Sequence, residues 1–455
     1  MGTFLYQFIL VVFFTLITFC GLGQSRHDIE FSRIDSLIEV SENLLVTKPK
    51  ASKLMAIKAL ELSETEQDRK RLAWAVETYA TATYYLGEKV EAKKNFIKAL
   101  VLYNDLNDKG GISSVLHNLA LLEQDNGSYH KALRLYRQAL ANDERSSDYQ
   151  GILTTRNALA TLYLDMEQFA KAAIMLDSLR LLSYLYHSPY GRLDYHINRG
   201  VYFSKTGSLN QANAQFLKAS ALADSLNVNE DKVLIKLNLA EVAYKRKNFQ
   251  KSLQLCNEVL KTKSITNIQE ITSMALLQKG LILAALDSIP KARRLLSKAR
   301  SLTLISENYR QMGPLMLQIG NAQFDFKNYD EAIGSYRESV LYAQRAGMVK
   351  TLADVYRALY VTYKELKKED SSEIYLKEFT AILDTIEKNN RIGTQVDTSM
   401  LSYVEDAKEF ASDASKINTQ SSKADNRMYL LLGILISLSI LTLVIYLRRK
   451  NRIEK

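Results

Sequence analysis

One pattern of small and large residues returns every 40 residues along most of this 455-residue chain. It is plain in the segments EAKKNFIKAL (91–100), KALRLYRQAL (131–140) and QANAQFLKAS (211–220). Each segment has an Ala near its start, an aromatic residue four positions later and another Ala three positions beyond that. Because spacings of four and three place side chains on one face of an α-helix, each unit is predicted to contain a helix with one buried stripe.

Eight units share this register without an insertion. Their first position is always Ala or Ser, at Ala92, Ala132, Ala172, Ala212, Ser252, Ala292, Ala332 and Ser372. Twelve residues earlier, seven of the eight units have Ala or Gly, at Ala80, Ala120, Ala160, Gly200, Ala240, Gly280 and Gly320. Small residues let two helix backbones approach closely, so each unit predicts an antiparallel helix pair. Segments of turn-forming composition separate the pairs at 107–111, 187–191 and 227–231.

The scarcity of chain breakers supports helix throughout, since the sequence has 18 Gly and only 4 Pro. Ser52, Ala56 and Ala59 stand at the same phase before the first unit and predict one further, imperfect hairpin, with Pro49 in its turn. A single hairpin cannot bury its apolar face alone, so stacked hairpins predict an all-α solenoid. Its predicted parts are an N-terminal capping hairpin in 24–72 and eight repeats in 73–380.

The small residues at positions 8 and 20 of each unit, the aromatic residue at 24 and the Ala at 27 resemble the tetratricopeptide repeat. The second-helix pattern is clear in FAKAAIMLDSL (169–179) and NYDEAIGSYRES (328–339), and the resemblance covers roughly residues 30–380. Two features depart from that repeat, because its period is about 34 residues and its first helix carries a Trp that these units lack. HEAT-type repeats run to roughly 40–47 residues, but the 8/20/24/27 pattern and the scarcity of Pro favour the tetratricopeptide interpretation. The resemblance implies a right-handed α-solenoid of antiparallel helix hairpins.

Both ends of the chain are apolar. Residues 1–23 are predicted to be a signal peptide that is cleaved after Gly23, although no Lys or Arg precedes the apolar run. A retained N-terminal anchor and lipidation at Cys20 are the alternatives. Residues 428–447 form an uncharged segment long enough to cross a bilayer as a transmembrane helix. The basic tail 448–455 then places the C-terminus in the cytoplasm.

These ends predict a single-pass protein of the bacterial inner membrane with its repeats in the periplasm. Between the repeats and the membrane segment, residues 381–427 are polar and lack the repeat. A weak apolar stripe runs through this part at Val396, Met400, Val404, Ala407, Ala411, Ala414 and Ile417. This stripe is compatible with a helical stalk that pairs with a second copy, and a flexible linker is the alternative.

The resemblance to tetratricopeptide arrays implies that the first helices line a concave groove for an extended peptide or a partner helix. Positions 2, 5, 6, 9 and 12 of each unit are expected to face this groove. Position 6 carries a row of amides, Asn118, Asn198, Asn238, Gln278 and Gln318, which can hydrogen-bond a peptide backbone. Aromatic anchors are expected at Trp74, Tyr84, Tyr244 and Phe324. Two alternatives stay open: the amides tie neighbouring helices together, and the aromatic residues belong to the core.

The sequence contains no pattern that predicts catalysis. The five His residues show no zinc-ligand spacing, and no nucleotide-binding loop, nucleophile elbow or EF-hand loop occurs. The net charge of +10 is spread without the basic stripe that nucleic-acid binding needs. We therefore expect no enzyme activity, no cofactor, no metal site and no nucleic-acid partner.

The overall layout is similar to the sensory half of bacterial membrane regulators, notably those of Bacteroidetes. In such regulators a cytoplasmic histidine kinase or DNA-binding domain follows the membrane helix, whereas this sequence ends at Lys455. We therefore expect a membrane-anchored adaptor that binds a protein or peptide partner outside the cytoplasm. The alternative is a sensory input subunit that signals through the membrane helix to a separate protein.

Overall fold

The computed structural model describes residues 28–262 and 269–390, and all regular structure in these ranges is helical. The prediction of an all-α repeat fold is confirmed for this part of the chain. The predicted signal peptide 1–23, membrane segment 428–447, tail 448–455 and most of the stalk 381–427 lie outside the described residues. None of the described helices combines the length and the apolar character that crossing a bilayer requires.

The described helices form consecutive antiparallel hairpins. Residues 28–44 and α2 (Pro49–Thr65) make the first one. Eight further hairpins follow, and in each the first helix packs against the second. They are α3 (Arg69–Tyr85) with α4 (Lys89–Asp105), α5 (Lys109–Asp125) with α6 (Tyr129–Ser146), α7 (Tyr149–Asp165) with α8 (Phe169–Leu185), α9 (Pro189–Lys205) with α10 (Leu209–Leu226), α11 (Asn229–Lys245) with α12 (Phe249–Lys261), α13 (Gln269–Ala285) with α14 (Ile289–Leu304), α15 (Tyr309–Asp325) with α16 (Tyr329–Ala346), and α17 (Val349–Glu365) with α18 (Glu369–Asn390).

The 40-residue period follows from helix length. Most helices have 17 residues, and three residues of turn separate most helices from the next. The middle residue of each three-residue turn has a left-handed backbone, as at Gln67, Asn107 and Glu167. The first helices of several units are capped by the residue just before them, since the side chains of Asp68, Asp108, Asp148 and Ser188 accept backbone N–H bonds.

In the hairpins that carry Gly at the small-residue position, this residue of the first helix lies against the large residue of the second. A β-carbon added to Gly320 would lie 2.5 Å from the ring of Tyr336, and one added to Gly200 would lie 2.6 Å from the ring of Phe216. Both rings are at most 1% exposed. The predicted contact between small-residue faces is therefore more specific than expected, because the space left by Ala or Gly is filled by an aromatic or aliphatic side chain.

Two details of the predicted turns are wrong. Gly111 lies inside the first turn of α5, where a β-carbon would be 2.3 Å from the ring of Tyr103. Glycine is present there because the preceding helix packs too closely for a side chain. Pro49 is the first residue of α2, a position where its fixed φ suits the helix and its missing N–H costs no hydrogen bond.

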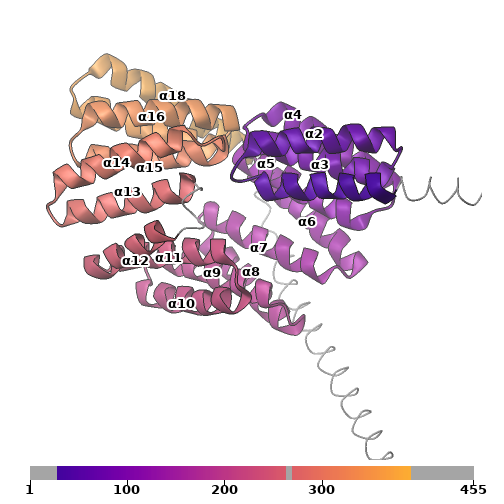
Figure 1. Ribbon diagram of the computed structural model, residues 1–455. Coiled ribbons are helices and arrows are strands. Elements are labelled where there is room, and N and C mark those ends of the chain that lie inside the picture. The colour runs from indigo at the N-terminus through magenta and orange to yellow at the C-terminus, as the bar shows by residue number, and fades with distance from the viewer. Residues whose placement is uncertain (1–27, 263–268, 391–455) are drawn as a thin grey trace, which may run out of the picture.

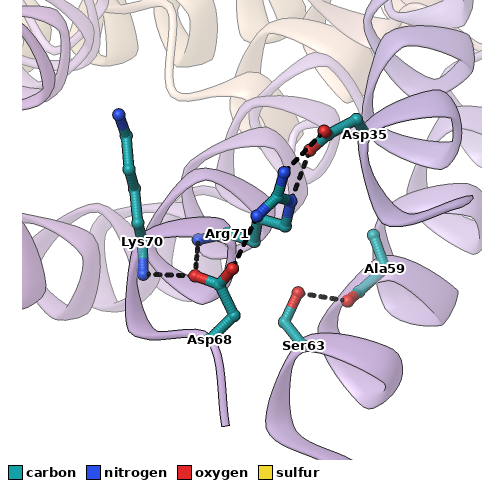
Figure 2. A network of polar contacts seen from close by, with 6 residues as sticks. All are labelled: Asp35, Ala59, Ser63, Asp68, Lys70 and Arg71. Atoms are coloured by element: carbon teal, nitrogen blue, oxygen red, sulfur yellow. Dashed lines mark hydrogen bonds and ion pairs between the residues drawn. The ribbon is translucent and has the colours of Figure 1, made fainter. Parts of the chain in front are cut away.

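The N-terminal hairpin is joined to the repeats by a branched ion pair, which Figure 2 shows. Arg71 of α3 donates two bonds to Asp35 of helix 28–44, at 2.7 and 2.8 Å, and a third to Asp68 at 2.7 Å. Asp68 also caps α3 through the N–H groups of Lys70 and Arg71. One arginine thereby fixes both the start of α3 and its position against the preceding hairpin.

The array curves so far that its two ends meet. Successive first helices pack against each other along the array, more closely than successive second helices do, so the first helices form the inner side. In Figure 1 the orange helices α16 and α18 come to lie beside the purple helices of the first repeats. Contacts between α15 and α3 and between α18 and α6 confirm this. We call this contact between the two ends the seam.

The interlock of small and large residues can be tested at Gly320. Replacing Gly320 with Ala places a methyl group against the Tyr336 ring, so we expect a loss of about 1–3 kcal/mol in the free energy of unfolding. Urea denaturation followed by circular dichroism measures it. Gly334→Ala is the matched control, because a β-carbon there meets only the end of Arg300 at 3.6 Å. The control should be neutral or slightly stabilising, and an equal loss in both variants would contradict the interlock.

Candidate functional site

A cleft opens on the inner side of the array between α15 and α17. One part of it, of about 380 Å³, is lined by Leu317, Asn321, Phe324, Tyr336, Asp354, Arg357, Ala358 and Val361. A second part, of about 460 Å³, shares Leu317, Asn321 and Asp354 and continues to the seam. We call the two parts together the inner cleft.

The far wall of the inner cleft comes from the other end of the array. Asp125 at the end of α5 and Asp165 at the end of α7 line it, together with Gln124 and Tyr129. Arg310 of α15 reaches across and donates two bonds to the Asp125 carboxylate, at 2.8 and 3.3 Å. The inner cleft is therefore completed only where the two ends meet.

Arg310 contacts more than one residue across the seam. Its guanidinium also lies 5.3 Å from the ring centre of Tyr84, whose hydroxyl donates to Asp125. Burial disfavours the charge of Arg310, but Asp125 and Tyr84 outweigh it and raise the pKa of the guanidinium. The Asp125 side chain is only 7% exposed. Arg310, Asp125 and Tyr84 thus form one charge-paired unit, which we call the latch.

The other two acids of the inner cleft are less well compensated. Burial raises the pKa of Asp165, whose carboxylate accepts a bond of 2.8 Å from Gln124. Burial also raises the pKa of Asp354, whose closest cation, Arg357, is 3.9 Å away. Lys350 donates to the backbone carbonyl of Asp165 at 2.7 Å rather than to a carboxylate. The inner cleft therefore offers charged groups of both signs beside an apolar floor.

Of the residues predicted from sequence to bind a partner, the structure brings Gln318 and Phe324 together in the inner cleft. Gln318 is exposed, while Phe324 is half-buried with its ring 5.3 Å from that of Tyr329. Both belong to α15, and each occupies one of the positions that were expected to face the groove.

Three other predicted residues have partners inside the array. Asn118 donates to Glu77 of the preceding first helix at 3.1 Å, and Asn198 donates to Asn157 at 2.5 Å. Tyr84 is 7% exposed and belongs to the latch. For Asn118 and Asn198 the structure agrees with the alternative in which the amides tie neighbouring helices together. For Tyr84 it agrees with the alternative in which the aromatic residues belong to the core.

The remaining predicted residues lie apart from the inner cleft. Trp74 is 36% exposed and lines a separate pocket of about 540 Å³ between α3 and α5, where its indole N–H donates to Glu42. Asn238 and Gln278 are half-buried in α11 and α13. Tyr244 is half-buried with its ring 5.7 Å from that of Phe249.

The sequence reasoning named no other residue of the inner cleft, but part of it was within reach. Leu317, Asn321, Asp354 and Val361 occupy positions 5, 9, 2 and 9 of their units, all of which were expected to face the groove. A search for positions that combine amide, apolar and acidic side chains on adjacent units would have found them. Asp125, Asp165, Arg310 and Lys350 join the cleft through the seam, which periodicity alone does not reveal. Among the described residues, no group of three or more His, Cys, Asp or Glu side chains could hold a metal ion.

Comparison with known families supports the repeat type. Residues 111–180, which cover most of α5 to α8, match the sequence model of the tetratricopeptide repeat. No curated protein sequence matches the chain. The family match and the repeated hairpins make the chain a tetratricopeptide-like helical repeat protein.

Several solved structures have a similar fold at low sequence identity. A STAND signal-transduction ATPase with a tetratricopeptide repeat sensor from Pyrococcus horikoshii is 18% identical, with a TM-score of 0.47 over 78% of this chain and 54% of that one. The chain thus spans about half the length of that protein. A Rap conjugation gene regulator of the plasmid pLS20, solved with the Phr* peptide, is 11% identical, with a TM-score of 0.47 over 80% and 97%. A tetratricopeptide repeat protein from Parabacteroides merdae is 15% identical, with a TM-score of 0.40 over 63% and 99%.

Asp194 of α9 stands at the same unit position as Trp74 and Asp354. The pH dependence of stability therefore tests whether an acid at this position is buried on the inner side of the array. Burial, reinforced by Asp231, raises its pKa to about 6. The folded state therefore binds this proton more tightly than the unfolded state, and stability falls as the pH rises from about 4 to above 6. Asp194→Asn removes this cost, so we expect the variant to gain about 1–2 kcal/mol over the wild type at pH 7 but little at pH 4.

Urea midpoints of both proteins at pH 4, 5.5 and 7 measure this difference. Asp224→Asn is the control for loss of one surface acid, because the Asp224 side chain on α10 is 68% exposed and makes only a surface ion pair with Lys232. A constant difference between Asp194→Asn and the wild type at all three pH values would contradict the raised pKa.

Proposed function

We propose that the described array is a non-catalytic scaffold that binds an extended segment of a partner protein along its inner side. The inner cleft is its main site. The observation that supports this proposal most is the combination in one cleft of exposed amide side chains, an apolar floor and a proline in the lining helix α15. Each of these features serves a different part of a peptide.

The amides serve the peptide backbone. Gln318 and Asn321 are exposed on α15, and the Oδ1 of Asn321 accepts a bond of 2.9 Å from the Tyr336 hydroxyl. The Asn321 amide still carries N–H donors, and the Gln318 amide carries both donor and acceptor groups. Such groups can hydrogen-bond the N–H and C=O of an extended chain with little regard to its sequence. Pro314 adds to this, because a proline inside α15 donates no N–H to the carbonyl of Arg310, one turn earlier. Arg310 and Pro314 both line the cleft.

The apolar floor of the inner cleft can bind a side chain of the peptide. Leu317, Phe324 and Val361 present apolar surface, and Val361 is 38% exposed. The volume of this part, about 380 Å³, is ample for one large apolar side chain of a bound segment. Asp354 and Arg357 at its rim offer charges of both signs, so the rim adds orientation rather than a preference for one net charge.

Photo-crosslinking in the native cell tests this proposal. A photoreactive residue at position 318 or 321 should give adducts with one dominant partner, because both side chains face the inner cleft. The same residue at position 118 or 198 is the matched control, since Asn118 and Asn198 donate within the array. Equal partner yields at all four positions, or adducts within the chain alone at 318 and 321, would overturn the proposal.

We further propose that the scaffold is held at a bacterial membrane by residues 428–447, with the repeats outside the cytoplasm. Support comes from the sequence alone, as given above. Alkaline carbonate washing of membranes should leave the full chain in the pellet and release a variant that ends at Arg427. Protease added to spheroplasts should digest the repeats. Release of the full chain, or protection of the repeats, would count against anchoring or against this orientation.

A further inference from the structure

The seam is built unlike the rest of the array. Within the array, neighbouring helices share buried apolar clusters. Among the described residues, no such cluster has members from both sides of the seam. The two ends are therefore joined without a common apolar core.

Polar contacts take the place of that core. They are the latch, the bond from Lys350 to the Asp165 carbonyl, an ion pair of 3.1 Å between Lys50 and Glu307, and a bond of 3.5 Å from Asn308 to the Val46 carbonyl. Lys50 and Glu307 are 60% and 34% exposed, and such pairs contribute little to stability. Because the described residues of the two ends share no apolar cluster, separating them at the seam would leave the apolar core of each end intact.

Two turns also meet at the seam, and both carry glycine. A β-carbon at Gly87 would lie 3.2 Å from the backbone of Arg345, and one at Gly347 would lie 2.4 Å from the Lys89 ammonium. Gly87 has φ +68°, but the equivalent turn position holds Lys in other units, at Lys247, Lys327 and Lys367, with φ of 55–60°. The turn backbone accepts a side chain in those units, so the main obstacle to one at position 87 is the Arg345 backbone at the opposite end of the array.

We propose that the array opens and closes at the seam, and that a peptide bound in the inner cleft holds it closed. This proposal rests on the proposed function, because it describes the regulation of the same site. The inner cleft has one wall from α15 and α17 and the other from the ends of α5 and α7, so only the closed form presents both walls. A peptide that contacts both walls binds the closed form more tightly and shifts the population towards it.

Linkage makes the effect reciprocal. A substitution that weakens the seam without touching the cleft lowers the closed fraction, and the apparent affinity for the peptide falls by the same factor. Arg310 and Asp125 are poor choices for this test because both line the inner cleft. Gly87 is suitable because it contacts Arg345 and does not line the cleft.

The test uses the full chain and a peptide selected from a displayed library of random 12-residue sequences. Peptides are kept only if Leu317→Arg, which blocks the cleft floor, abolishes their binding. Their dissociation constants are then measured by fluorescence anisotropy for the wild type, Gly87→Lys and Gly207→Lys. Gly207 is the matched control, since it has the same turn position and φ +81°, and a β-carbon there meets no described atom within 4 Å.

Seam distance is measured in parallel by spin labels at the exposed positions 90 and 341. Position 90 lies at the start of α4, and position 341 lies in α16, six residues before Gly347. The two native cysteines are replaced by Ala. We expect Gly87→Lys to lengthen this distance, to weaken peptide binding about tenfold and to recover the wild-type distance at saturating peptide. Gly207→Lys should match the wild type in all three respects.

A Gly87→Lys chain that is open at the seam but binds peptide with wild-type affinity would overturn the coupling while leaving the proposed function intact. A library that yields no peptide sensitive to Leu317→Arg would overturn the proposed function, and the coupling with it. If Gly87→Lys does not fold, Lys50→Glu replaces it, because it sets two acids against each other at the seam. The double variant Lys50→Glu with Glu307→Lys should restore the affinity and the distance that the single variant loses, and a Lys50→Glu chain that opens without losing affinity would also overturn the coupling.

Discussion

The close approach of two helices at one small residue determines most of this structure. In most hairpins an Ala or Gly of the first helix stands opposite a larger side chain of the second, as Gly320 stands opposite Tyr336. Because this pattern recurs every 40 residues, successive hairpins stack on one another in a regular way. Repeated rotations of one sign accumulate into curvature. The curvature brings the last repeats back to the first ones and so creates the seam.

Function is proposed at the place where this curvature ends. A straight array of the same hairpins would present the α15–α17 surface without an opposite wall. Here Asp125 and Asp165, at the ends of α5 and α7, face Arg310 and Lys350 across the seam. The site is thus a product of the whole array rather than of one repeat. The far wall shares no buried apolar cluster with α15 and α17, whereas neighbouring repeats do share such clusters, and the proposed opening of the seam rests on this difference.

Much of the fold was predictable because it is local and periodic. The helix pairs, their small-residue faces and the buried stripe follow from spacings along the sequence, and Ala132, Tyr136 and Ala139 are all fully buried as the pattern predicts. The period of 40 was visible, but its origin in 17-residue helices was not. The turns were misplaced by a few residues because Gly111 was interpreted as a turn former, while its role is to leave space for Tyr103.

The site was less predictable because it depends on how repeats sit against each other. The position of Asn118 on the inner side follows from its phase, but its bond to Glu77 depends on the rotation between adjacent first helices. The meeting of Arg310 with Asp125, 185 residues apart, depends on the sum of many such rotations. No spacing in the sequence encodes that sum in a form that can be found by inspection.

Closure of the array is the central claim, and cysteine crosslinking across the seam tests it most directly. With the native cysteines removed, Lys50→Cys and Glu307→Cys should be joined within one chain by a short bifunctional reagent, because the two side chains form an ion pair of 3.1 Å. The control pair is Lys50→Cys with Lys247→Cys, which places the second thiol in the turn between α11 and α12, away from the seam (Figure 1). Rapid crosslinking of the first pair alone is the predicted result. Equally slow crosslinking of both pairs would show that the ends do not meet and would contradict the account.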